Sequence, residues 1–137
     1  MRRSQVRGIP WLRGVQDRTP QTDRVLRRVT FAPVETGGVP GLACTPDEGP
    51  ATRTLLYLHG GGYVIGSAAV SREFMAHVAV GLGARVVTPD YRLAPEHPFP
   101  AAQQDGIAVY RALLAEGVEP ARLAVGGDSA GGGLTLA

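Results

Sequence analysis

The sequence predicts an α/β fold with a mostly parallel sheet and flanking helices, and three observations support this class. Short apolar runs alternate with helical stretches of about 10–15 residues, which is the spacing of βαβ units. The run Leu55–Leu58 is apolar throughout, as is typical of a strand buried on both faces of a sheet. Of the 137 residues, 44% are hydrophobic and 19% charged, so the chain can bury a core of its own.

Residues 1–24 are expected to form an Arg-rich, poorly ordered leader. Eight of the fourteen basic residues lie in residues 1–28, all of them Arg, and they give this segment a net charge of +6. Pro10 and Pro20 interrupt the segment, which shows no sustained hydrophobic periodicity, and Trp11 is its only aromatic residue. We therefore interpret it as a solvated segment and predict no nucleic-acid partner.

Residues 25–137 are expected to form the folded domain, which opens with a hairpin. The β-branched stretch 25–34 predicts a strand, Gly37-Gly38 a turn, and 39–45 the partner strand. Pro40 favours the edge of the sheet, because proline cannot donate a backbone hydrogen bond. A polar loop over 46–52 then leads to the buried strand at Leu55–Leu58.

Two helices follow, each with an apolar face. The first is expected over 70–82, with Ser71 as its N-cap and an inward face made of Phe74, Met75, Val78 and Leu82. The second is expected over 101–117, with an inward face made of Ile107, Tyr110, Leu113 and Leu114.

The remaining elements complete the alternation. Strands are expected over 85–88 and 123–125, and the three prolines of 95–100 predict an irregular loop. A last helix begins at 134–137 and has barely completed one turn. We therefore expect the chain to be the front half of a longer domain, with the C-terminal half absent and the last strand left open at one edge.

The strongest functional signal is Gly127-Asp128-Ser129-Ala130-Gly131, a G-x-S-x-G between a predicted strand and a predicted helix. This context is typical of a nucleophile elbow, in which a sharp turn lifts the serine hydroxyl clear of the sheet. The helix N-terminus that follows offers free N–H groups to a developing oxyanion.

A second signal is His59-Gly60-Gly61-Gly62, directly after the buried strand. Three consecutive glycines can aim several backbone N–H groups into one concavity, since no Cβ blocks them. The chain has no Lys and no phosphate-binding glycine motif, so an oxyanion is the better occupant than a phosphate.

These segments resemble the hormone-sensitive-lipase-like esterases, the GDXG group of the α/β-hydrolases. The resemblance rests on the glycine loop 59–67, the stretch Asp90-Tyr-Arg-Leu-Ala-Pro-Glu-His-Pro-Phe-Pro-Ala101, and the motif 127–132, and it runs from about residue 25 to 137. It implies a partial α/β-hydrolase fold. That family carries an N-terminal cap, of which residues 1–24 would be a remnant at most.

The resemblance also implies a role for each matching residue. Ser129 corresponds to the nucleophile, and the N–H groups of Gly61, Gly62 and Ala130 to the oxyanion hole. His59 corresponds to a histidine that supports the oxyanion loop, and Asp128 to an acid with a structural role. The stretch 90–100 corresponds to a hydrogen-bonded loop behind the site.

The triad of this fold runs Ser, acid, His along the chain, but neither an acid nor a histidine follows Ser129. His59, His77 and His97 precede the nucleophile, on elements with other roles. We therefore predict an esterase of short or medium acyl esters that is nearly inactive as this chain alone.

Two alternatives stay open: a non-catalytic fragment or interaction module, and a serine peptidase on the same fold. A small-molecule ester is the predicted partner. No metal or organic cofactor is expected, because Cys44 is the only cysteine and the histidines are scattered. The absence of a signal-peptide pattern and of a long apolar run predicts a cytoplasmic protein.

Overall fold

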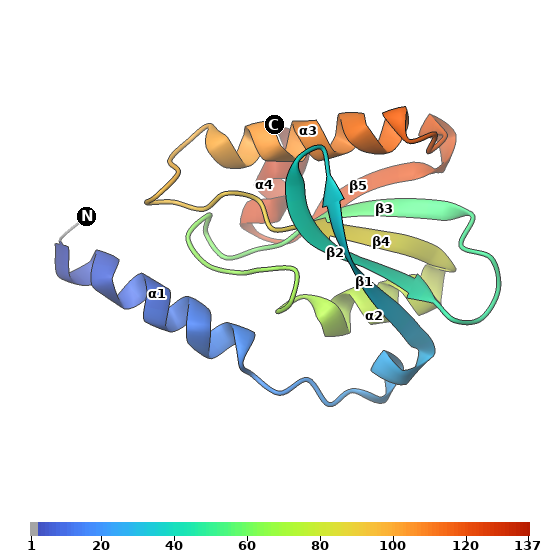
Figure 1. Cartoon of the computed structure of the whole chain (residues 1–137), viewed down its shortest axis with the longest axis horizontal. Coiled ribbons are helices and arrows are strands. Elements are labelled where there is room, and N and C mark those ends of the chain that lie inside the picture. The colour runs from blue at the N-terminus through green and yellow to red at the C-terminus, as the bar shows by residue number, and fades with distance from the viewer. Residues whose placement is uncertain (1–2) are drawn as a thin grey trace.

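A five-stranded sheet forms the centre of the molecule in the computed structural model, which describes residues 3–137 and the side chains from residue 8 onward (Figure 1). The strand order is β1-β2-β4-β3-β5. The strands are β1 (Val29–Thr36), β2 (Val39–Pro46), β3 (Arg53–Leu58), β4 (Ala84–Pro89) and β5 (Leu123–Gly127). β4, β3 and β5 run parallel, whereas the β1–β2 hairpin joins β4 antiparallel, so the α/β class is confirmed with a mixed sheet.

Helices cover both faces of the sheet. The helices are α1 (Arg3–Asp17), α2 (Arg72–Leu82), α3 (Ala101–Ala115) and α4 (Ala130–Leu136), with short 3-10 turns at Arg24–Arg28 and Pro120–Arg122. On one face α2 packs Met75 against Val86, and on the other α3 packs Val109 against Leu56. Alternate residues of β3 and β4 thus enter two apolar layers, which explains why these strands are apolar throughout.

The predicted leader contains a helix. α1 runs through Pro10 to Asp17, where the sequence predicted poor order, while residues 1 and 2 of that segment lie outside the described residues. Hydrophobic periodicity did not reveal α1 because the helix has no continuous apolar face. Among its described apolar side chains only Ile9 is buried, and Trp11 is exposed. The division of the chain at residue 24 stays a prediction.

The first strand begins later than predicted. Residues 24–28 form a 3-10 turn, because the Asp23 carboxylate accepts a hydrogen bond from the Val25 N–H at 2.9 Å and caps it. The strand then starts at Val29. Val25 is nevertheless buried, beneath α2.

The buried helix faces were predicted incorrectly in part. Met75 and Leu113 are buried as predicted, but Phe74, Leu82, Ile107 and Tyr110 are exposed. Small residues replace them at the sheet, namely Ala76 and Ala79 in α2 and Ala102 and Gly106 in α3. Small side chains let a helix lie close to a sheet, so the largest apolar side chains do not mark the inward face.

The last helix starts at Ala130, earlier than the predicted 134, and within it Gly131 packs directly on the Leu58 carbonyl at the end of β3. β5 lies at one edge of the described sheet, as expected. None of the helices in the described part of the chain has the length and apolar character needed to span a membrane.

Candidate active site

Ser129 occupies a sharp turn between β5 and α4. Its backbone angles are φ 50° and ψ −117°, a region that side-chain-bearing residues rarely adopt and that stores strain. The residue is exposed, and within the described chain its hydroxyl makes no hydrogen bond. A strained, exposed serine at a strand-to-helix turn has the geometry of a nucleophile elbow.

Glycines on either side make this turn possible. A Cβ on Gly127 would come within 2.5 Å of the carbonyl oxygens of both Gly131 and Leu58. A Cβ on Gly131 would collide directly with the Leu58 carbonyl oxygen. Strand and helix therefore meet at backbone contact, and only glycine fits at these two positions.

The glycine loop lies beside the elbow and also uses left-handed backbone. Gly61 has φ 126° and Gly62 has φ 61°. The Gly61 carbonyl accepts hydrogen bonds from the N–H groups of Val64 at 3.1 Å and Ile65 at 3.0 Å, which close the loop into a tight turn. Ala130, the third predicted oxyanion residue, is buried at the first position of α4.

Asp128 joins the elbow to the glycine loop. Its Oδ1 accepts hydrogen bonds from the Gly60 N–H at 2.8 Å and from the Tyr57 hydroxyl at 2.5 Å. Burial, reinforced by this bond to Asp128, raises the pKa of Tyr57, so the hydroxyl stays protonated and donates. Asp128, the residue next to Ser129, thus fixes Gly60, the first glycine of the loop.

His59 lies under the loop and holds it from below. It is 2% exposed, and its ring stacks on Tyr91 with the centroids 4.2 Å apart. Its Nδ1 lies 2.8 Å from the Gly60 carbonyl oxygen, which can only accept, so Nδ1 carries the proton. Burial lowers the pKa of this imidazole and keeps it neutral. Nε2 has no hydrogen-bond partner among the described residues.

None of the three histidines hydrogen-bonds to Ser129 in the described chain. His59 is occupied by the loop, and the His77 Nε2 lies 2.8 Å from the Asp23 carboxylate. His97 lines a separate cavity of about 330 Å³ together with Gly62. Within residues 8–137, the acidic, histidine and cysteine side chains nowhere gather as a metal site.

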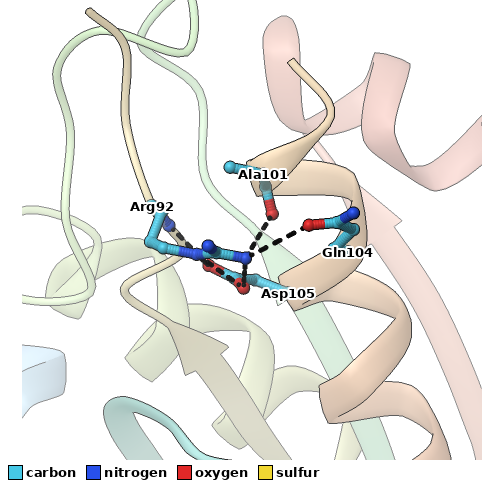
Figure 2. A network of polar contacts seen from close by, with 4 residues as sticks. All are labelled: Arg92, Ala101, Gln104 and Asp105. Carbon is cyan, nitrogen blue, oxygen red and sulfur yellow. Dashed lines mark hydrogen bonds and ion pairs between the residues drawn. The ribbon is translucent and has the colours of Figure 1, made fainter. Parts of the chain in front are cut away.

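The stretch after β4 forms a loop braced by hydrogen bonds. The Asp90 carboxylate accepts from the Ala68 N–H at 2.6 Å, and the Tyr91 hydroxyl donates to the His59 carbonyl at 2.5 Å. Arg92 reaches α3, where its Nη2 lies 2.7 Å from the Asp105 carboxylate (Figure 2). This hydrogen bond to the carboxylate raises the pKa of the guanidinium. These contacts support the loop and include no contact with Ser129.

A cavity of about 430 Å³ opens in front of the glycine loop. Its walls include Gly60, Gly61 and Asp128 from the site, Phe74 from α2 and Gln16 from α1. The cavity is large enough for a small organic group. The N-terminal helix therefore contributes one wall of the space beside the site.

The sequence analysis missed several residues that hold the site. Tyr57 stands in an apolar strand, where a buried hydroxyl needs a partner, and this was the one available signal. Asp105 is 7% exposed, and the available signal was that it is the one acidic residue of α3. Arg13, which donates hydrogen bonds to the Val64 and Ala94 carbonyls next to the glycine loop, gave no signal, because it looks like the other arginines of the N-terminal segment.

Comparison with known proteins agrees with this geometry. A family model described as the alpha/beta hydrolase fold matches residues 55–137. An acetyl-hydrolase of Streptomyces hygroscopicus is 49% identical over 85 residues, covering 62% of this chain and 28% of its own length. An esterase of Acinetobacter venetianus is 37% identical over 109 residues, covering 80% of this chain and 36% of its own.

Solved structures give the same result. The crystal structure of an esterase from the bacterial hormone-sensitive lipase family superposes with a TM-score of 0.76 and 36% identity, over 98% of this chain and 50% of that one. The chain belongs to the alpha/beta hydrolase fold family. Within that family it is similar to the hormone-sensitive-lipase-like esterases, and it spans about a third of the length of the curated relatives it matches.

Proposed function

We propose that the protein is a carboxylic ester hydrolase for short or medium acyl esters, with Ser129 as the nucleophile. The observation that carries the proposal is the elbow itself: a strained, exposed serine whose neighbour Asp128 binds the glycine loop at Gly60. The similarity to esterases and an acetyl-hydrolase supports the ester as substrate.

In this proposal the Ser129 hydroxyl attacks the ester carbonyl carbon. The negative charge that develops on the carbonyl oxygen is stabilised by the N–H groups of Gly61, Gly62 and Ala130. Because these backbone donors are fixed before the reaction, they require no reorganisation as the charge appears. The alcohol then leaves, and water hydrolyses the acyl-enzyme.

Proton transfer is the step that this chain does not supply. A serine hydroxyl at its ordinary pKa is a weak nucleophile and needs an adjacent base. His59 and His77 are engaged by other groups, and none of the described histidines hydrogen-bonds to Ser129. In this proposal the base and its orienting acid therefore come from residues outside these 137. Without them, the rate falls by about 10⁴–10⁶.

Asp128 and His59 support the reaction without touching the substrate. Asp128 holds the loop against the elbow, and His59 holds the loop from beneath. Neutral His59 places no cation beneath the oxyanion loop, so in the proposed mechanism the stabilisation comes from the backbone.

The test compares two polypeptides with p-nitrophenyl acetate and butyrate. The 137-residue chain alone should show no hydrolysis above buffer. A chimera of residues 1–137 with the remaining C-terminal part of the Streptomyces hygroscopicus acetyl-hydrolase should hydrolyse both esters. Ser129→Ala in the chimera should reduce kcat by about 10⁴-fold or more.

Two results would count against the proposal. The first, turnover by the 137-residue chain that Ser129→Ala abolishes, would contradict the proposed lack of a base in this chain, although it would leave Ser129 as the nucleophile. The second is chimera activity that survives Ser129→Ala. Cleavage of peptide p-nitroanilides in preference to esters would favour a peptidase instead.

A further inference from the structure

Helix α1 is attached to the molecule mainly by polar contacts. Ile9 is buried, but Trp11, Leu12 and Val15 are 68%, 45% and 48% exposed. Apolar burial therefore holds α1 only weakly. The position of this helix must depend on its polar side chains.

Arg13 makes the most extensive of these contacts. Its Nε donates to the Val64 carbonyl at 2.8 Å, and its Nη2 donates to the Ala94 carbonyl at 2.9 Å. The same guanidinium forms a two-pronged ion pair with Glu96, with N–O distances of 3.1 and 3.0 Å. One side chain thus holds three acceptors from two segments about 30 residues apart in the sequence.

Those two segments also bind each other beside the site. The Val64 N–H donates to the Gly61 carbonyl, and the Ala94 N–H donates to the Tyr63 carbonyl at 2.8 Å. Val64 is thus tied to the glycine loop as part of the same chain segment, and Ala94 is tied to it by the hydrogen bond to Tyr63. Arg13 closes this arrangement by binding the free carbonyl of each.

We propose that Arg13 is a positioning residue that fixes the glycine loop of residues 60–65 and couples its conformation to helix α1. This role rests on the proposed function only in identifying the loop as the oxyanion loop. The coupling itself is a property of the hydrogen bonds and holds whether or not Ser129 reacts.

The chemistry of the contact requires Arg. A planar guanidinium presents five N–H donors in a fixed fork, so it can serve two carbonyl groups and a carboxylate together. A Lys ammonium is a single point that cannot reach three separated acceptors in this geometry. The ion pair with Glu96 is partly exposed and contributes little by itself, so the two carbonyl contacts carry the effect.

Amide hydrogen exchange on the 137-residue chain tests this proposal. In Arg13→Ala, the amides of Val64, Ile65 and Ala94 should exchange about tenfold faster. Amides of β3 and β4 should exchange at the parent rate. Arg18→Ala is the matched control, because within the described residues the Arg18 side chain makes no hydrogen bond or ion pair; it should change none of these rates.

Two further variants separate positioning from charge and from general stability. Arg13→Lys keeps the charge, but the loop amides should still exchange faster than in the parent chain. The increase in exchange rate should be more than half of the increase seen in Arg13→Ala. The exchanged pair Arg13→Glu/Glu96→Arg restores an ion pair but offers no donor to the Val64 and Ala94 carbonyls from position 13. Its loop amides should also remain fast.

The proposal is overturned if Arg13→Ala accelerates exchange only within α1, or if it accelerates exchange evenly over the whole sheet. It is equally overturned if either Arg13→Lys or the exchanged pair restores the parent rates, because the ion pair alone would then suffice. Exchange is measured without substrate, so a failure here is independent of any failure of Ser129 as a nucleophile.

Discussion

At the scale of single residues, Asp128 connects the two motifs of the site. Its carboxylate binds the Gly60 N–H and the Tyr57 hydroxyl, and it precedes Ser129 in the chain. Tyr57 also stacks on Phe74, with the ring centroids 4.5 Å apart. The hydroxyl of Tyr57 and its ring therefore make separable contributions, one to the site and one to packing.

Tyr57→Phe separates these contributions. The ring and its stacking on Phe74 remain, while Asp128 loses one donor. We expect the free energy of unfolding, measured by urea denaturation, to fall by about 1.5–3 kcal/mol, the usual net contribution of a hydrogen bond to a charged group.

Tyr110→Phe is the control for this measurement. Tyr110 is 38% exposed, and within the described residues its hydroxyl has no hydrogen-bond partner. Its loss should change the unfolding free energy by less than about 0.5 kcal/mol. Equal effects of the two substitutions would show that the bond to Asp128 contributes nothing.

Residues that carry their own local signature could be identified from the sequence. Ser129 has a positive φ, and a Cβ on Gly127 or Gly131 would collide with neighbouring backbone, so the G-x-S-x-G spacing reflects the geometry of the turn. Arg13 could not be identified, because its partners Val64, Ala94 and Glu96 are distant in the sequence and two of them are backbone carbonyls. Every residue has a backbone carbonyl, so the residue type does not indicate which carbonyl accepts a hydrogen bond from Arg13.

At the scale of elements, the approach of α4 to β3 determines where Ser129 lies. Gly131 packs on the carbonyl group of Leu58, at the end of the strand that leads into the glycine loop. The close approach of these two elements brings Ser129 beside residues 59–62.

Gly131→Ala tests this close approach. The added methyl group would collide with the Leu58 carbonyl, a rigid backbone group, so we expect a loss of about 1–3 kcal/mol in unfolding free energy. Gly132→Ala is the matched control in the same helix, since its Cβ would come no closer than 3.4 Å to any neighbouring atom outside its own helix.

Gly132→Ala should be neutral or should stabilise the chain by up to about 1 kcal/mol, because Ala is the better helix former. Both values come from urea denaturation. The account of the elbow would be contradicted if Gly131→Ala were as well tolerated as Gly132→Ala.

The types of the elements, helix or strand, could be predicted well from the sequence. The buried faces of the helices could be predicted less well. Apolar, β-branched runs identified the central strands because those strands are buried on both faces. The inward faces of α2 and α3 are built from Ala and Gly, which carry little hydrophobic signal. α1 was not predicted because polar contacts hold it, and these follow no helical period.

At the scale of the whole molecule, two apolar layers enclose the sheet and bury Cys44 within it. Cys44 lies in β2, opposite Phe31 of β1 and Val86 of β4, and is fully buried. Burial raises the pKa of its thiol to about 11. Only the thiolate reacts rapidly with disulfide reagents, so both burial and pKa protect it.

Cys44 should therefore report global unfolding. In the native chain a disulfide reagent should label it only through the unfolded state, at a rate that rises with urea in step with the denaturation curve. The double variant Cys44→Ala/Ala124→Cys places a thiol at an exposed position of β5 and should label at once. Native labelling of Cys44 at that control rate would contradict the enclosed sheet.

The central claim concerns which serine reacts, and covalent trapping tests it most directly. The chimera described above is treated with phenylmethylsulfonyl fluoride and digested, and the modified peptide is identified by mass spectrometry. We predict one sulfonyl adduct, on Ser129, with loss of ester hydrolysis in proportion to labelling. An adduct on Ser67 or Ser71 that accounts for the lost activity, with Ser129 unmodified, would contradict the account.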